Sequence, residues 1–186
     1  MPMIPVLMLS LALAADGGST IPIGTPVSGS PAERARTTAK IVSGIISYAR
    51  WPDALPKTTL CIMGTSPMSD ALPQLEQHTG STVEVHRVAA GIIPADCNVI
   101  YLTRVSPPAQ AQIFSTVRGR AILSITDADP ACRMGAMFCL RYAAETISFN
   151  INIDAISRSL VRVDPRVLRL SRHKASLTNP QPIVSE

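Results

Sequence analysis

The chain contains four cysteines, and residues of this type could act either as zinc ligands or as disulfide partners, depending on their spacing. Zinc sites use close pairs such as Cys-x2-Cys or nearby His, and neither pattern occurs here. Cys132 and Cys139 are seven positions apart and bracket Gly135, which suits a closed loop. That choice leaves Cys61 with Cys97, one of three pairings that four cysteines allow. We therefore predict two disulfides, worth about 4 kcal/mol for the long loop and about 2.5 kcal/mol for the short one in the chain-entropy relation.

The other residue types that carry chemistry form no recognisable catalytic set. The three histidines stand far apart, and none falls in an HExxH spacing: His78, His86 and His173. There is no Gly-x-Ser-x-Gly nucleophile elbow in the sequence. We therefore expect no enzymatic activity, no metal and no cofactor.

Two short polar segments offer weaker alternatives. Gly64, Thr65 and Ser66 follow an apolar run and could bind a small anion at a helix N-terminus, although the glycine series and lysine of a phosphate loop are missing. Asp127 and Asp129 precede a proline and indicate a turn at a strand end. A calcium or magnesium site would need more oxygen ligands at close spacing.

The first fifteen residues carry no charge and are apolar from Ile4 onward. That length is short of the ~20 residues that span a bilayer. The segment ends in Ala12-Leu13-Ala14, the small-x-small pattern of a signal-peptide cleavage site, although no basic residue precedes it. We predict a signal peptide over residues 1–14 and export to a compartment where disulfides persist.

The remaining chain divides into a leader, one domain and a tail. Residues 15–31 are rich in Gly, Ser, Thr and Pro and predict a flexible leader, and ordered structure is expected from Ala32. We place the domain at residues 32–174 and a flexible tail at residues 175–186, which contain two prolines.

Within the domain, helical and strand patterns alternate. The spacing predicts helices over residues 32–51, 67–77 and 107–118 and strands over 59–64, 83–88, 98–103 and 120–126. Such alternation is typical of a mostly parallel sheet with helices on both faces. We predict an α/β fold, a single-domain three-layer sandwich.

The pattern changes after Cys132. Residues 136–142 and 146–151 predict an antiparallel strand pair near the C-terminus, and Asn152 could cap a short helix. Asp164-Pro165 predicts a further helix start, with a side-chain cap and a proline in the first turn. Its apolar residues are expected to face the core: Val167, Leu168 and Leu170.

Charge is sparse and concentrated near the C-terminus. Charged residues make up 16% of the chain, against about 25% in an average protein. Residues 141–174 carry seven basic and three acidic side chains, which equals the whole net charge of +4. This stretch suits an acidic protein or anionic lipid, or is simply a solvated helix face. Nucleic acid is not expected, because the seven aromatic residues form no stacking row among the basic ones.

Several short motifs, taken together, resemble the YfiR family of periplasmic regulators over residues 32–172. They are I-I-S-Y-A-R-W-P at 45–52, L-C-I at 60–62, Cys97 before a strand, I-L-S-I-T-D at 122–127, F-C-L at 138–140, F-N-I-N at 149–152, S-R-S at 157–159 and V-D-P at 163–165. The resemblance implies a compact α/β sandwich without enzymatic activity, located in the periplasm. It also implies disulfides at all four cysteines, in agreement with the pairing above.

The resemblance further implies partners. YfiR-like proteins bind the periplasmic sensor region of an inner-membrane diguanylate cyclase, YfiN, and hold it inactive. An outer-membrane lipoprotein, YfiB, sequesters the repressor, and homodimers are a family property. A competing hypothesis is a periplasmic ligand-sensing module, with a crevice at the carboxyl ends of the strands near residues 64–66, 103–106 and Asp127.

Candidate partner contacts lie in and beside the predicted Cys132–Cys139 loop, where Met and Phe could make adaptable apolar contacts. Ordinary core packing is the alternative for these apolar side chains. The candidates are Met134, Met137 and Phe138, with Glu145, Ile147, Arg158 and Arg162 at the rim.

Overall fold

The computed structural model describes residues 24–27, 29–75 and 83–171. The predicted signal peptide and tail therefore lie outside the described residues. Within these ranges, no helix is both long enough and apolar enough to cross a membrane.

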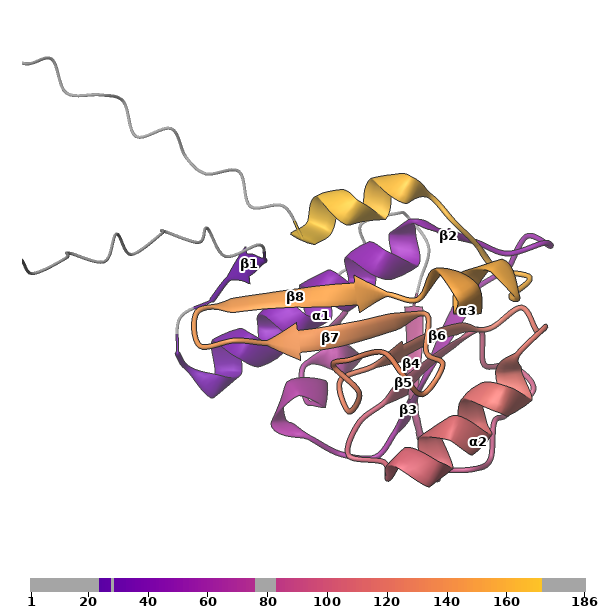
Figure 1. Cartoon of the computed structure of the whole chain (residues 1–186), viewed down its shortest axis with the longest axis horizontal. Helices are drawn as coiled ribbons and strands as arrows, with labels where there is room; N and C mark the ends of the chain where they lie inside the picture. The colour runs from indigo at the N-terminus through magenta and orange to yellow at the C-terminus, as the bar shows by residue number, and fades with distance from the viewer. Residues whose placement is uncertain (1–23, 28, 76–82, 172–186) are drawn as a thin grey trace, which may run out of the picture.

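A seven-stranded sheet forms the centre of the molecule (Figure 1). Its strands are β1 (Thr25–Pro26), β3 (Thr58–Met63), β4 (Val83–Val88), β5 (Val99–Leu102), β6 (Leu123–Thr126), β7 (Phe138–Tyr142) and β8 (Thr146–Ile151). The spatial order is β1-β8-β7-β6-β5-β3-β4. The strands from β4 to β7 are parallel, whereas β8 is antiparallel to both β7 and β1. Helices lie on both faces, so the predicted α/β sandwich with its antiparallel pair is confirmed.

The longest helix, α1 (Pro31–Ser47), covers one face of the sheet. Ser30 caps its N-terminus by accepting a hydrogen bond from the Glu33 amide at 3.2 Å, and Pro31 fits the first turn because no amide is needed there. The helix buries an aliphatic stripe against alternate side chains of β3, β5, β6 and β7. The residues are Ile41, Val42, Ile45 and Ile46 on the helix and Leu60, Ile62, Tyr101, Leu123, Ile125, Phe138 and Leu140 on the sheet.

The opposite face is covered by α2 (Pro107–Val117), which packs Ile113, Phe114 and Val117 against the remaining side chains of β3 and β5. This second core also contains Cys61, Cys97 and Cys139, all buried. Because the side chains of a strand alternate between faces, Cys61 points toward α2 while its neighbours Leu60 and Ile62 point toward α1.

Both predicted disulfides are formed. Cys61 in β3 is bonded to Cys97, just before β5, with their Cα atoms 5.9 Å apart. Cys132 is bonded to Cys139 in β7, with a Cα separation of 5.4 Å. Both separations lie within the usual range for disulfides, and the pairing argued from spacing is confirmed.

The helix predicted over residues 67–77 is wrong. The chain instead forms two short 3-10 turns, η1 (Pro67–Ser69) and η2 (Leu72–Gln74), and residues 76–77 lie outside the described part. Pro73 explains the difference, because it has no amide to donate and its ring clashes with the carbonyl four residues earlier in an α-helix.

Ordered structure also begins earlier than Ala32, the expected start. Thr25–Pro26 form β1 alongside β8, and the Val27 amide donates to the Glu145 carbonyl at 2.9 Å. The edge of β8 presents backbone groups that need partners, and a proline is tolerated there because an edge strand has a free side.

The C-terminal segment follows the predicted caps. Asn152 Oδ1 accepts from the Ala155 amide at 2.9 Å and begins α3 (Ile153–Ser157). The Arg166 amide donates to Asp164 Oδ1 at 2.8 Å at the start of η3 (Pro165–Ser171). The turn is 3-10 rather than α, with three residues per turn. Val167 and Leu170 therefore share the core-facing side, whereas Leu168 is 46% exposed and its predicted burial is wrong.

Candidate functional site

A groove of about 780 Å³ opens beside α3 and a small two-stranded ribbon. The ribbon pairs β2 (Ala49–Arg50) with β9 (Arg162–Val163), and it holds the segment after α1 against the segment after α3. The groove is lined by Trp51, Pro52, Ile156, Ser157, Ser159, Leu160, Val161, Arg162 and Val163. Trp51 is fixed in the wall because its indole Nε1 donates to the Ala121 carbonyl at 3.0 Å.

Exposed apolar side chains gather on the same C-terminal segment. Leu160 lines the groove and is 54% exposed, and α3 carries Ile153, which is 70% exposed. Burial of such side chains releases roughly 25 cal/mol per Å² of apolar surface. Apolar side chains beside a groove with a polar rim are typical of a surface that contacts another molecule.

Arg162 supplies positive charge to the groove. Arg162 lies directly opposite Arg50 in the β2–β9 ribbon, and like charges at opposed positions destabilise a strand pair. Arg50 donates to the carbonyls of Ser47 and Ala49 at 2.7 Å each. Arg162 forms no ion pair with any residue in the described ranges. An acidic group on a bound molecule would relieve this repulsion.

The Cys132–Cys139 loop positions α3 and therefore one wall of the groove. The Asn152 amide donates to the Met137 carbonyl at 2.9 Å, and Asn152 Nδ2 donates to the Cys132 carbonyl at 3.4 Å. The same side chain caps α3 through Oδ1. Asn152 thus joins both ends of the loop to the start of the helix, which makes the short disulfide a covalent support for the groove.

Three of the predicted partner contacts lie inside the protein. Met137, Phe138 and Ile147 are at most 3% exposed. Phe138 packs edge-to-face on Phe149, with ring centroids 5.7 Å apart. These side chains belong to the core of the chain, the alternative interpretation of the apolar candidates, and we exclude them from the contact surface.

The other four predicted contacts are accessible but not adjacent. Arg162 lines the groove, and Arg158 lies on the turn that leaves α3, paired with Asp154 at 2.9 Å. Met134 is half-buried within the disulfide loop. Glu145 lies in the β7–β8 turn, at the opposite end of β8 from α3 (Figure 1), about 20 Å away at 3.3 Å per residue. The groove thus contains Arg162 but not Arg158, and Met134 lies in the disulfide loop that supports α3.

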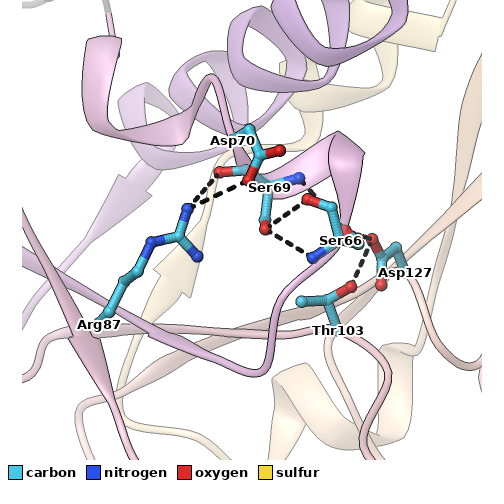
Figure 2. Close-up of polar contacts among 6 residues, drawn as sticks. All are labelled: Ser66, Ser69, Asp70, Arg87, Thr103 and Asp127. Carbon is cyan, nitrogen blue, oxygen red and sulfur yellow. Dashed lines mark hydrogen bonds and ion pairs between the residues drawn. The ribbon is translucent and has the colours of Figure 1, made fainter. Parts of the chain in front are cut away.

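The predicted crevice at the carboxyl ends of the parallel strands is filled by the chain itself (Figure 2). Ser66 Oγ accepts from the Ser69 amide at 3.2 Å, and Ser69 Oγ accepts from the Ser66 amide at 3.1 Å. Gly64 has a φ of +87°, and a Cβ there would collide with the Thr103 carbonyl. The Asp127 carboxylate lies 3.4 Å from Ser66 Oγ and would repel an anion. We therefore do not retain Gly64, Thr65 and Ser66 as an anion site.

Asp127 belongs to a buried polar cluster. Its Oδ2 accepts from Tyr101 Oη at 2.9 Å and from Thr103 Oγ1 at 3.0 Å. Burial raises the pKa of Asp127, although the hydroxyl donors oppose that shift. Burial also raises the pKa of Tyr142 to about 12, and Tyr142 is hydrogen-bonded to Thr38 at 3.2 Å. Within the described ranges, no three His, Cys, Asp or Glu side chains gather as a metal site requires.

The groove was missed by sequence reasoning, although some of its residues were singled out. Arg162 was a candidate contact and Trp51 belonged to the motif at residues 45–52, whereas Leu160 was not singled out. One residue could have indicated the groove in the sequence. Leu160 is an apolar residue between Ser159 and the basic stretch that follows.

The fold and the groove define a disulfide-linked α/β sandwich that presents a contact surface on its C-terminal segment. The family profile described as DUF4154, YfiR/HmsC-like, matches residues 35–172, and the chain belongs to this family. Members are periplasmic, non-catalytic regulators of cyclic di-GMP signalling that act through signalling partners.

Proposed function

We propose that this protein is a periplasmic repressor that binds the sensor region of a YfiN-like inner-membrane diguanylate cyclase and lowers cyclic di-GMP synthesis. The observation that carries the proposal is the groove beside α3, with exposed Leu160 and with Arg162, which lies opposite Arg50 in the β2–β9 ribbon. A segment with an apolar side chain and a neighbouring carboxylate would complement it.

Repression then follows from a difference in affinity. A partner shifts a two-state equilibrium only by the ratio of its affinities for the two states. The repressor must therefore bind the inactive cyclase more tightly than the active one. A YfiB-like outer-membrane lipoprotein that occupies the same groove would relieve repression by competition. We further propose that the repressor is a homodimer.

The direct test is binding of the purified oxidised protein to the periplasmic region of its cyclase, measured by biolayer interferometry. Leu160→Asp introduces a charge into the groove and should weaken binding at least about tenfold, as expected for a central interface residue. Ile92→Asp is the matched control, because Ile92 is 68% exposed and lies outside the groove lining. Equal affinities for both variants and the wild type would remove the groove from the interface.

The cellular test is cyclic di-GMP in strains with and without the gene. Deletion should raise the nucleotide level, and the rise should vanish when the neighbouring cyclase is also deleted. An unchanged level after single deletion, under both oxidising and reducing conditions, would contradict repression.

The short disulfide provides a third test, because Asn152 ties its loop to α3. Cys132→Ser with Cys139→Ser should weaken both binding and repression at normal protein level. Full repression by this double variant would show that the loop does not support the contact surface.

A ligand-sensing module is the second candidate, favoured by the groove volume of about 780 Å³, within the ~300–1,000 Å³ of small-molecule sites. A metabolite that stabilises the wild type in thermal-shift assays, but not Leu160→Asp, would favour this alternative.

A further inference from the structure

In the described part of the chain, the central sheet ends on one side in an open strand, β4. The strand has six residues and pairs only with β3, whereas β1 at the other edge has two residues and includes Pro26. Apart from the β3 ladder, the backbone of β4 forms no hydrogen bond within the described ranges. An open edge of this length is a template on which another strand can pair.

The neighbouring ladder shows which backbone groups of β4 point outward. The Thr59 carbonyl accepts from the Asn98 amide, on the β5 side of β3, at 3.0 Å. Backbone groups alternate between the two sides of a strand, so the next residue, Leu60, bonds toward β4. Leu60 is level with Val85, and in a parallel ladder it bonds to the residues on either side of that position. The outward groups therefore belong to the odd-numbered residues of β4: Val83, Val85 and Arg87.

We propose that β4 pairs antiparallel with β4 of a second copy of this chain, across a two-fold axis at Val85, an assignment of the interface that rests on the homodimer proposed above. The pairing would give the outward amides and carbonyls their missing partners and extend the sheet through both copies. A two-fold interface requires that if residue i contacts residue j, then j contacts i. Two identical antiparallel edge strands meet this requirement.

The position of the axis follows from the faces of the sheet and from charge. Directly opposed residues lie on the same face, and a two-fold axis perpendicular to the sheet keeps each residue on its own face. The axis must therefore pass through a residue of β4 and not between two residues. With Glu84 or Arg87 on the axis, a charge faces its own copy, which is destabilising, and with His86 on the axis two imidazoles meet. With Val85 on the axis, two valines meet instead.

The register centred on Val85 matches side chains on both faces. On the face that α1 covers, Val83 and Val85 pack against the core but are only half-buried, so a second copy would cover them further. On the opposite face, Glu84 stands opposite His86 of the second copy. The two side chains already approach to 3.1 Å within one chain, and they would form the closer, non-hydrogen-bonded type of pair between chains, with Cα atoms about 4.5 Å apart.

Sedimentation equilibrium of the oxidised full chain over a concentration series measures the dimer, which should be weak because one strand pair is smaller than a standard interface. Arg87→Pro removes an outward amide from each copy and leaves the β3 ladder intact. Dimerisation should weaken about thirtyfold, which corresponds to two hydrogen bonds of roughly 1 kcal/mol each. Arg87→Ala is the matched control, because it also loses the ion pair with Asp70 but keeps the amide. Its dimer affinity should stay within about twofold of the wild type.

Cysteine cross-linking tests the register independently. All four native cysteines are in disulfides, so an introduced cysteine supplies the free thiol. Val85→Cys places two thiols at the axis, with Cα atoms about 5.5 Å apart in a hydrogen-bonded pair, a separation that a disulfide can bridge. This variant should form a covalent dimer in mild oxidant. Glu84→Cys, His86→Cys and Arg87→Cys should form much less.

The possible failures are distinguishable. A dimer whose affinity is unchanged in Arg87→Pro, or the absence of a covalent dimer in Val85→Cys, would overturn the β4 interface and leave the homodimer intact. Stronger cross-linking from position 84, 86 or 87 would overturn the register. A wild type that stays monomeric at every concentration would overturn both the homodimer and its interface, whereas repression of the cyclase is tested separately by the binding and cyclic di-GMP measurements above.

Discussion

The two faces of the central sheet are closed by different means. On the α1 face, aliphatic and aromatic side chains from β3, β5, β6 and β7 pack against a helix of 17 residues. On the α2 face, the helix has 11 residues, and β6 presents the hydroxyls of Ser124 and Thr126. Both disulfides contribute their cysteines to this second face. Covalent links therefore stabilise the side of the sheet where apolar burial is smaller.

The polar groups of the α2 face are satisfied, which explains how this face remains ordered. Thr126 Oγ1 donates to the Leu102 carbonyl at 3.0 Å, and Ser124 Oγ accepts from the Met137 amide at 3.0 Å. Such bonds offset desolvation but add only about 1 kcal/mol each. The α2 face thus depends more on its disulfides, and through the Cys132–Cys139 loop so does the groove beside α3.

The largest effect is expected from a cavity in the α1 face. Phe138→Ala removes a fully buried ring that packs on Phe149 and should lower the free energy of unfolding by about 3–5 kcal/mol. Urea denaturation of the oxidised protein measures the change. Leu168→Ala, at an exposed position, is the control and should change stability by less than about 0.5 kcal/mol. A loss below 1 kcal/mol for Phe138→Ala would contradict the dominance of packing on this face.

Removal of the long disulfide should have the next largest effect. Cys61→Ser with Cys97→Ser opens a link across 36 positions, and the free energy of unfolding should fall by about 4 kcal/mol. The wild type in reductant should lose at least as much. If oxidised wild type and double variant unfold at the same urea concentration, the α2 face does not need its covalent link.

The short disulfide should contribute less and act locally. Cys132→Ser with Cys139→Ser removes the disulfide between residues seven positions apart. The free energy of unfolding should fall by about 2.5 kcal/mol. Hydrogen exchange should accelerate in residues 132–139 and in α3, which Asn152 connects. Acceleration spread equally over α1 would argue against a local role.

The smallest loss of stability is expected from a substitution of Trp51, which follows α1 and lines the groove. Trp51→Phe removes the hydrogen bond from Nε1 to the Ala121 carbonyl and should cost about 1 kcal/mol. Thermal unfolding gives the change in stability, and binding to the cyclase region reports on the groove wall. A variant with unchanged stability and binding would show that this bond does not support the groove.

Much of the fold could be predicted from the sequence because its signals are local. Alternating strand and helix patterns identified the parallel sheet, and the side-chain caps at Asn152 and Asp164 correctly marked the starts of α3 and η3. The prediction of a helix over residues 67–77 failed because Pro73 cannot take part in α-helical hydrogen bonding, and two 3-10 turns form instead. The β7 strand is covered on both faces, so its apolar run gave no sign of which side chains would be accessible.

The groove could not be predicted for a different reason. Its lining joins residues 51–52 to residues 156–157 and 159–163, and these segments meet through β2 and β9, which have two residues each. Strands this short leave no periodic pattern in a sequence. Arg162 was singled out from charge alone, and only the β2–β9 register shows that it faces Arg50.

The most direct test of the difference between the two faces is hydrogen exchange of the wild type before and after reduction. Reduction should accelerate exchange in α2, in the segment that holds Cys97 and in α3 by larger factors than in α1. Equal acceleration in α1 and α2, or no change in α2, would contradict the conclusion that disulfides stabilise one face and packing the other.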